Sequence, residues 1–328
     1  MKTPHFFALF ALLLVAVTPA LANPTHTGTW TASVKNTQLQ LNLRHKGEKG
    51  GQIGMPVPIA AFQGLSTAEG STAPFKLERE AGTLHFEGRF SGGEGAGHFQ
   101  FAPSAAYTQA MGALGYTQLT PDQQFQLALF DITPARVKEL GALGYKDIPL
   151  KELIEVGIFQ VTPEYIRELG AAGYSKLTLK QLVQTRIHEV TPERIRALAA
   201  AGFKNLELDT LMSMSIHGVT PEFIREMSAA GFQNLTAKEL VAMRIHGMTP
   251  EFVREIRALG FANISQKELM NFRIHGVTPA FIQEMRAAGF PSATPEDLVK
   301  LRIHGVDSAF VRSMSGGGKG QGDTRKKP

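Results

Sequence analysis

The sequence has no cysteine and only one tryptophan among its 328 residues. Without cysteine the chain cannot form disulfide bonds and cannot be anchored to a membrane through a lipidated cysteine. We therefore expect packing alone to stabilise its fold.

Long apolar runs are missing as well, except at the start of the chain. Phe6–Val17 is an unbroken apolar stretch that follows Lys2 and precedes the small-residue pattern Ala20–Ala22. This arrangement predicts a secretory signal peptide, residues 1–22, cleaved after Ala22. The run is too short for a membrane anchor, which needs about 20 apolar residues. The sequence thus predicts a soluble bacterial protein of the periplasm or the medium, with no stable membrane insertion.

The predicted mature body carries little net charge. The formal charge of the whole chain is +5, of which Lys2 contributes +1 and the tail after Met314 a net +3, so the rest carries only +1. A near-neutral body lacks the basic footprint of a nucleic-acid-binding protein, and we expect no nucleic-acid partner. The glycine- and lysine-rich tail, residues 315–328, is predicted to be disordered.

Residues 23–102 have the alternation of a small antiparallel β domain. Apolar and polar side chains alternate at Trp30, Ala32, Val34, then Leu39, Leu41, Leu43, then Leu84, Phe86, Phe90, and again at Phe99 and Phe101. Strict alternation is typical of half-buried strands. We expect roughly five strands in a sandwich or partial barrel, with Ser91–Gly97 as a long flexible hairpin loop.

A 29-residue repeat occupies residues 103–314. Thr-Pro steps begin at Thr133, Thr162, Thr191, Thr220, Thr249 and Thr278, and Ser104 and Asp307 extend the same spacing at both ends. A fixed period of this length indicates an array of stacked supersecondary units. The chain contains seven full units and a truncated eighth.

Each unit reads as a pair of short helices. In the unit that begins at Thr220, this residue suits an N-cap and Pro221 the first helical position, and Gly231 suits a left-handed C-cap. Capping boxes that open the second helix occur at Thr120/Gln123, Thr178/Gln181, Thr236/Glu239 and Ser265/Glu268. The second helix of this unit has Leu240, Val241, Met243 and Ile245 as its expected apolar face. The predicted fold class is α+β, a small N-terminal antiparallel β domain followed by an α-solenoid.

A histidine recurs near the end of the second helix, at His188, His217, His246, His275 and His304. The same position holds Phe159 and Phe130 in the earlier units. Phenylalanine can replace a packed imidazole but not a metal ligand or a general base. We therefore expect half-buried structural rings that each donate one hydrogen bond, and no metal ladder.

Charged residues recur on the first helix. The arginines are Arg167, Arg196, Arg225 and Arg254, and the glutamates three residues before them are Glu164, Glu193, Glu222 and Glu251. One interpretation is a solvated face with weak ion pairs. The other is a charged stripe that binds a protein partner, because repeat proteins commonly bind through such surfaces.

Known catalytic patterns are missing. The sequence has no H-E-x-x-H, S-x-x-K or G-x-S-x-G motif, and Gly316–Lys319 is followed by glycine rather than by the serine or threonine of a P-loop. We expect no enzymatic activity, no catalytic residues and no cofactor.

The order of three segments resembles a known bacterial region. Residues 62–66 (FQGLS), 75–88 (FKLEREAGTLHFEG) and 97–103 (GHFQFAP) lead into repeats that contain R-I-H-G-V-T-P-E-F. This order resembles the C-terminal extracytoplasmic extension of BlaR/MecR-type membrane metallopeptidases, which also occurs in free-standing secreted proteins. The peptidase domain with its H-E-x-x-H motif is absent here, so no catalytic residue carries over. The resemblance implies an exported accessory or sensing module.

Two functions follow from these patterns. The first is a non-enzymatic module that binds a protein partner, such as a membrane sensor-peptidase, through the charged stripe. The second is a sensor of small molecules or cell-wall fragments, with a pocket around Trp30, Phe99 and Phe101, in the β domain or at its junction with the first repeat.

Overall fold

The computed structural model describes residues 26–45, 51–72 and 74–316. The predicted signal peptide and residues 317–328 of the predicted tail lie outside these ranges. The chain divides into two compact units, residues 1–163 (unit 1) and 164–328 (unit 2). The β-to-helix transition after residue 102 was predicted, but the first two repeats belong to the same compact unit as the sheet.

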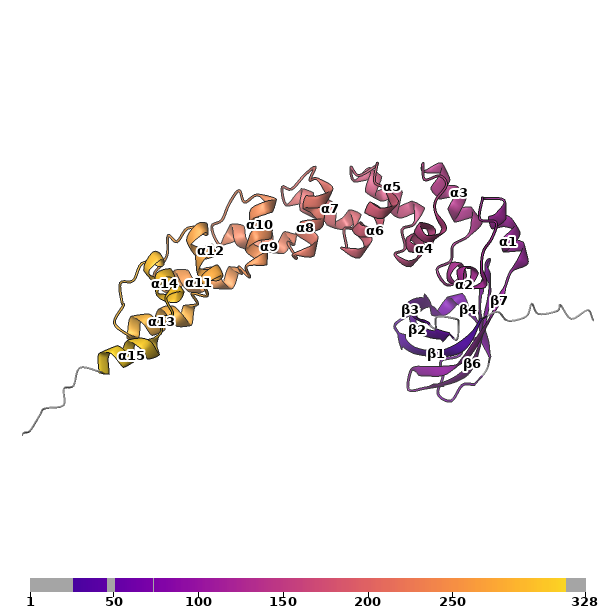
Figure 1. Ribbon diagram of the computed structural model, residues 1–328, viewed down its shortest axis with the longest axis horizontal. Helices are drawn as coiled ribbons and strands as arrows, with labels where there is room; N and C mark the ends of the chain where they lie inside the picture. Colours follow the sequence, from indigo (N-terminus) through magenta and orange to yellow (C-terminus); the bar gives the residue numbers. More distant parts are fainter. Residues whose placement is uncertain (1–25, 46–50, 73, 317–328) are drawn as a thin grey trace, which may run out of the picture. The chain divides into compact units, whose positions relative to one another are not determined.

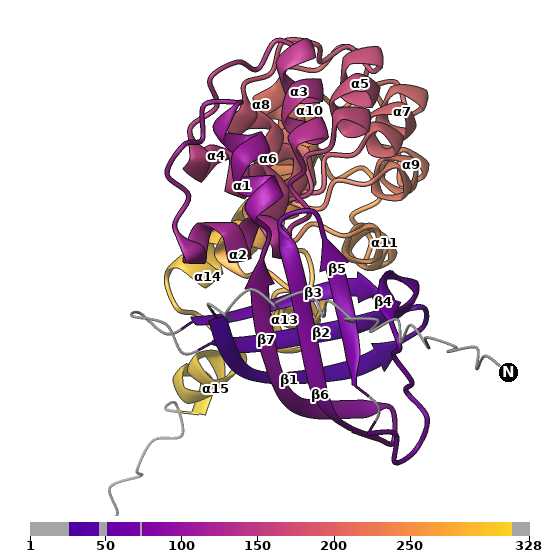
Figure 2. The same cartoon turned by 90° about the vertical axis from the view of Figure 1, so that its right-hand side faces the viewer.

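Unit 1 contains one antiparallel sheet that curls into a half-barrel (Figures 1 and 2). Its strands are β1 (His26–Lys35), β2 (Gln38–His45), β3 (Gly51–Pro58), β4 (Phe62–Gln63), β5 (Phe75–Arg79), β6 (Gly82–Ser91) and β7 (Glu94–Pro103). A short 3-10 helix, Ile59–Ala61, separates β3 from β4. The strand order is β3-β2-β1-β7-β6-β5-β4, so β1 and β7 pair in the middle of the sheet and β3 lies at one edge.

The sequence predicted the antiparallel strands but not their full number. The structure has a single seven-stranded sheet in the form of a half-barrel, which confirms the predicted partial barrel and rules out the alternative of a sandwich of about five strands. Strand β3 was missed because its sequence contains two prolines, Pro56 and Pro58, which a sheet tolerates at an edge. The expected flexible loop at Ser91–Gly97 is also wrong. Only Gly92 and Gly93 form the turn, with φ of +59° and +79°, and Ser91 pairs directly with Glu94.

Aromatic side chains fill the inner face of the sheet. Trp30 packs edge-to-face on Phe75 with ring centroids 5.4 Å apart, and Phe75 stacks on Phe86 at 4.8 Å. Helix α2 (Pro121–Leu129) adds Phe125, which stacks on Phe99 at 5.8 Å. Since buried aromatic pairs add to the free energy of area burial, this cluster fixes α2 on the sheet.

The remaining chain is helical. The other helices of unit 1 are α1 (Ala105–Gly112), α3 (Pro134–Ala142) and α4 (Leu150–Ile158). Unit 2 has α5 (Pro163–Ala171), α6 (Leu179–Ile187), α7 (Pro192–Ala200), α8 (Leu208–Ile216), α9 (Pro221–Ala229), α10 (Ala237–Ile245), α11 (Pro250–Ala258), α12 (Gln266–His275), α13 (Pro279–Ala287), α14 (Pro295–Ile303) and α15 (Ser308–Gly316). Within the described ranges, none of them has both the length and the apolar character required to cross a lipid bilayer.

The predicted caps are confirmed. The Thr220 side chain accepts a hydrogen bond from the Phe223 N–H, and Gly231 has a φ of +90°. All four predicted capping boxes form, at α2, α6, α10 and α12. Ser104 and Asp307 cap α1 and α15, which confirms that they extend the repeat spacing.

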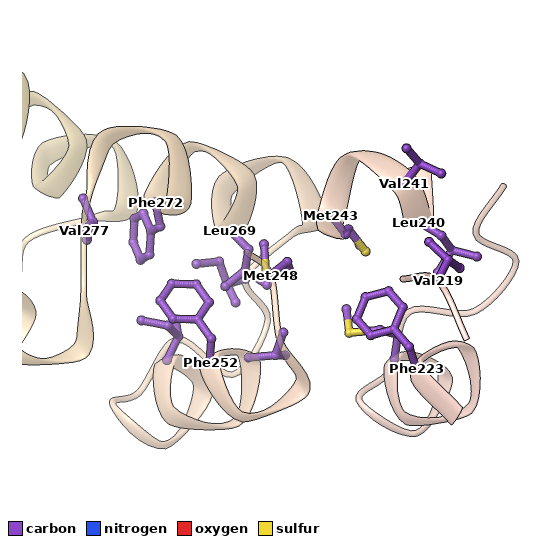
Figure 3. Close-up of a cluster of buried hydrophobic side chains, with 14 of the residues drawn as sticks. Val219, Phe223, Leu240, Val241, Met243, Met248, Phe252, Leu269, Phe272 and Val277 are labelled. Carbon is purple, nitrogen blue, oxygen red and sulfur yellow. The ribbon is translucent and has the colours of Figure 1, made fainter. Parts of the chain in front are cut away.

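Helices α7 to α14 of unit 2 share one continuous cluster of buried apolar side chains, which runs from Val190 to Leu298. Figure 3 shows Phe223 and Phe252, from first helices of two units, pointing toward side chains of the second helices such as Leu240 and Leu269. Among the second helices, α8 contacts α10 and α12 contacts α14, and the first helices α9, α11 and α13 contact in order.

Side chains at the fourth position of the unit join neighbouring segments in two ways. The polar ones donate to a carbonyl group 25 residues ahead, as Tyr107 to Ile132 at 2.7 Å, Arg136 to Val161 at 3.1 Å, Tyr165 to Val190 at 2.8 Å and Arg194 to Val219 at 3.1 Å. Later units have phenylalanine there, and an arginine lies over the ring, as Arg244 over Phe223 at 5.0 Å, Arg273 over Phe252 at 4.9 Å and Arg302 over Phe281 at 4.6 Å. These arginines also donate to a carbonyl of the preceding unit, which lacks a helical partner.

We expect Gly247→Ala to lower the free energy of unfolding more than Gly305→Ala. Both glycines have a left-handed backbone conformation, with φ of +65° and +67°. An alanine in this conformation lowers the free energy of unfolding by about 1–2 kcal/mol through backbone strain alone. A Cβ at Gly247 would lie 2.5 Å from the Arg273 guanidinium, whereas a Cβ at Gly305 has no atom within 4 Å. Urea titrations followed by far-UV circular dichroism measure both losses. Equal losses would show that the Arg273 contact adds nothing.

Candidate interaction surface

The predicted charged stripe consists of exposed ion pairs within single helices. Arg167 contacts Glu164 at 3.2 Å, Arg196 contacts Glu193 at 2.6 Å, Arg225 contacts Glu222 at 3.3 Å and Arg254 contacts Glu251 at 2.5 Å. Hydrogen bonding to its own backbone N–H in the first helical turn is the main cause that lowers the pKa of Glu193, and Arg196 lowers it further. Exposed pairs of this kind contribute about 0–1 kcal/mol each. Because each arginine already faces a glutamate, the stripe presents little net charge to a partner.

A row of exposed isoleucines is a second regular feature. The sequence interpretation assigned this position to the core. These isoleucines lie in the last turn of successive second helices and are spaced 29 residues apart. In unit 2 these are Ile187, Ile216, Ile245, Ile274 and Ile303, with 48%, 55%, 56%, 51% and 56% of their surface exposed. We call these five residues the isoleucine row. Single exposed apolar side chains are ordinary, but the same large residue exposed in every unit is not.

The expectation that Ile245 belongs to the buried face of its helix is therefore wrong. Leu240, Val241 and Met243 are buried, at 0%, 9% and 0% exposure. At about 100° per residue, Ile245 lies about 40° beyond Val241, outside the arc that faces the core. The period of the isoleucines was visible in the sequence. Their direction was not, because it depends on the rotation of the helix against its neighbours.

Arginines directly precede four members of the isoleucine row, at Arg186, Arg244, Arg273 and Arg302. Three of them are held by two contacts each, a hydrogen bond to a carbonyl and a phenylalanine ring under the guanidinium. Arg186 lies over the Tyr165 ring at 4.8 Å. A guanidinium fixed in this way stays charged and needs no further ordering when a ligand binds.

The repeat histidines differ from the prediction. His188 and His217 are half-buried, but the side chains of His246, His275 and His304 are exposed. The recurring contact is a hydrogen bond to the main-chain carbonyl of the histidine. The carbonyl of His188 accepts it from Ser215, that of His217 from Arg244 and that of His246 from Arg273. The position is therefore joined to the next unit through its backbone rather than through its ring.

The pocket predicted around Trp30, Phe99 and Phe101 is a packed core. These side chains are 1%, 1% and 0% exposed. A ligand could reach them only if the sheet opened, so the structure corrects this prediction. The Trp30 Nε1–H donates to the carbonyl oxygen of Glu87 at 3.1 Å, which satisfies the indole within the core.

Unit 1 has a groove elsewhere, with a volume of about 560 Å³. It lies between the edge strand β3 and the C-terminal ends of α2 and α4. Met55, Leu129 and Ile158 give it apolar walls. Arg79 and Asp131, whose Nε and Oδ1 atoms are 3.6 Å apart, add a polar pair. A groove with apolar walls and few polar groups is suited to a small ligand.

The isoleucine row makes a prediction about stability. We expect Ile245→Ala to lower the free energy of unfolding by about 1 kcal/mol or less, because more than half of the side chain is already in water. Leu240→Ala, in the same helix α10, should cost about 2–5 kcal/mol because Leu240 is fully buried. Urea denaturation of both variants measures the two losses. Similar losses would mean that Ile245 is held in the core.

Comparisons with known proteins leave this surface without a precedent. No family model matches the chain, and no match was found among curated proteins or solved structures. The resemblance to the extracytoplasmic extension of BlaR/MecR-type metallopeptidases thus stays a prediction from the sequence.

Proposed function

We propose that the protein is an exported, non-enzymatic interaction module in which residues 103–314 form an α-solenoid next to the β domain. Three observations support this architecture. First helices begin with proline every 29 residues from Pro134 to Pro279. Four pairs of successive helices of like position contact in unit 2, namely α8 and α10, α9 and α11, α11 and α13, and α12 and α14. The buried cluster passes through successive units without interruption, as expected when each unit is stabilised by its neighbours.

The binding surface we propose is the isoleucine row, and its regular exposure is the observation that carries the proposal. Natural surfaces rarely repeat a large exposed apolar residue without a use for it. Four of the five isoleucines follow an arginine, so the surface combines apolar anchors with fixed positive charge. The partner with matching chemistry is a protein segment that carries apolar side chains interspersed with aspartate or glutamate.

The predicted signal peptide and the resemblance to BlaR/MecR-type extensions support a role outside the cytoplasm. In this role the protein serves as an accessory or sensing module, and a membrane sensor-peptidase is the partner that the resemblance suggests. The charged stripe on the first helices is the weaker candidate surface, because its arginines and glutamates pair with each other.

Affinity capture from periplasmic extract with matched variants tests this function. We expect the triple variant Ile216→Asp, Ile245→Asp, Ile274→Asp to lose the captured partner, since each new carboxylate repels an acidic segment and removes an apolar anchor. The control is Arg196→Glu, Arg225→Glu, Arg254→Glu, which alters an equal number of exposed residues on the first helices and should keep the partner. Quantitative mass spectrometry of the captured proteins provides the measurement.

Two outcomes contradict this proposal. If the isoleucine variant retains its partner and the arginine variant loses it, the charged stripe is the binding surface. If both variants capture the same proteins as the wild type, the repeats do not bind through either surface. Circular dichroism of each variant checks that its helix content is unchanged.

A small-molecule function is the second candidate, favoured by the groove at β3, α2 and α4. Cell-wall fragments and β-lactams carry carboxylates that Arg79 can pair with, next to apolar walls. This site replaces the pocket first expected around Trp30.

The groove is tested by thermal unfolding in the presence of muropeptides or a β-lactam. A ligand at 100 times its Kd stabilises the folded state by about 2.7 kcal/mol, which raises the midpoint by several degrees. Arg79→Ala should abolish that rise, while the exposed control Arg44→Ala should keep it. No rise for the wild type with any of these ligands would exclude them from the groove.

A further inference from the structure

Three side chains with the chemistry of metal ligands meet at the end of the sheet in unit 1. His26 begins β1, His45 ends β2, and Asp122 lies in the first turn of α2. One ligand atom from each residue lies within 4.8 Å of the other two. Among the described residues, these three form the one group of at least three histidine, cysteine, aspartate or glutamate side chains with that spacing. The sequence did not reveal it, because Asp122 lies 96 residues after His26.

The two imidazole rings are held in place by the surrounding structure. His26 is only 6% exposed and stacks on Phe125, with centroids 5.0 Å apart and planes within 9°. His45 packs against the edge of the same ring at 5.7 Å and lies 5.7 Å from His26. Its position also depends on Gly51, where a Cβ would lie 2.5 Å from the His45 Nε2. The two imidazoles are therefore held near each other before any ion binds, which favours a specific site, and the exposed Asp122 side chain is the ligand that can adjust.

The hydrogen bonds in this cluster are incomplete. The His26 Nε2 and the Asp122 Oδ1 are hydrogen-bonded. The Nδ1 atoms of His26 and His45 are both buried, and neither has a hydrogen-bond partner among the described residues. Buried polar atoms without partners are rare, and a bound ion or water is a common reason for them. The contact between His26 and Asp122 satisfies the Nε2 of His26 alone, and a single ion would bind one nitrogen of each ring.

We propose that His26, His45 and Asp122 bind a divalent transition-metal ion of the zinc type. Two imidazoles and one carboxylate are a common set of protein ligands for zinc, and they leave a fourth position free. Donor atoms around tetrahedral zinc are about 3.4 Å apart, a spacing that side-chain rotation can reach from the present positions. Asp122 is 57% exposed, so solvent reaches the group from the side of this residue.

The ligand set also favours one class of ion over another. Calcium and magnesium are bound by oxygen atoms, and imidazole is a poor ligand for both. The ion would join the ends of β1 and β2 to the start of α2, three segments that are separate in sequence. Its effect is a stronger attachment of α2 to the sheet, which does not depend on the partner of the isoleucine row.

Isothermal titration with Zn²⁺ tests this site, with the chain from residue 23 onward, free of any affinity tag and stripped of metal by a chelator. We expect one high-affinity zinc per chain. Asp122→Asn and His45→Gln should each weaken binding by about 100-fold or more, because loss of even a neighbour of a ligand costs about 10–100-fold. The control is His98→Gln, an exposed histidine on β7 outside the cluster, which should bind like the wild type.

Two further readouts keep the result decisive. Zinc should raise the unfolding temperature of the wild type and of His98→Gln, and not that of Asp122→Asn. Bound Co²⁺ should give visible absorption bands in the same two proteins only. Asp122→Asn keeps the helix start and an oxygen acceptor for His26, so it reports on the site even if His45→Gln fails to fold. The proposal is overturned if the wild type binds no zinc at micromolar concentration, or if Asp122→Asn weakens binding by less than about tenfold.

Discussion

The structure depends on the short length of its helices, eight to ten residues each within the described ranges. A helix of this length barely forms in water, so each one needs caps at its ends and a neighbour on its side. The eighth unit shows what the neighbour contributes. Phe310 and Met314 are 50% and 70% exposed, whereas Phe281 and Met285, at the same positions one unit earlier, are 3% and 0% exposed. These side chains are thus buried only where a neighbouring repeat packs against them.

A second constraint is that carbonyl groups at helix ends and in the connections between helices have no intrahelical partner. The chain meets it with different side chains along its length, tyrosine and arginine at Tyr107, Arg136, Tyr165 and Arg194, then a phenylalanine with an arginine above it in the later units. The later arrangement satisfies a carbonyl and buries a ring at once. It also places a fixed guanidinium directly before an exposed isoleucine at Ile245, Ile274 and Ile303. The same arginines therefore stabilise the fold and belong to the candidate surface.

Local features could be predicted from the sequence, and features that depend on tertiary direction could not. Thr220, Gly231 and the capping boxes were identified because their hydrogen bonds span only a few residues. Ile245 was misplaced because a difference of about 40° around the helix separates core from solvent. Trp30 was assigned to a pocket because alternation indicates which face of a strand is apolar, and not whether that face is filled. His26, His45 and Asp122 escaped notice because only the folded sheet brings them together.

Helix α2 lies where the sheet meets the helices of unit 1. The α-solenoid proposed for residues 103–314 would need something at its first helix pair to cover the apolar side chains that a preceding pair would bury. In unit 1 the sheet has this role, because Phe125 of α2 stacks on Phe99 and the Gln124 side chain donates to the carbonyls of Ala81 and Ser104 at 3.0 and 2.9 Å. The proposed metal site lies at the same junction, at the first turn of α2. A bound ion would therefore act where the sheet packs on the first helices of unit 1, and it would strengthen the attachment of α2 to the sheet.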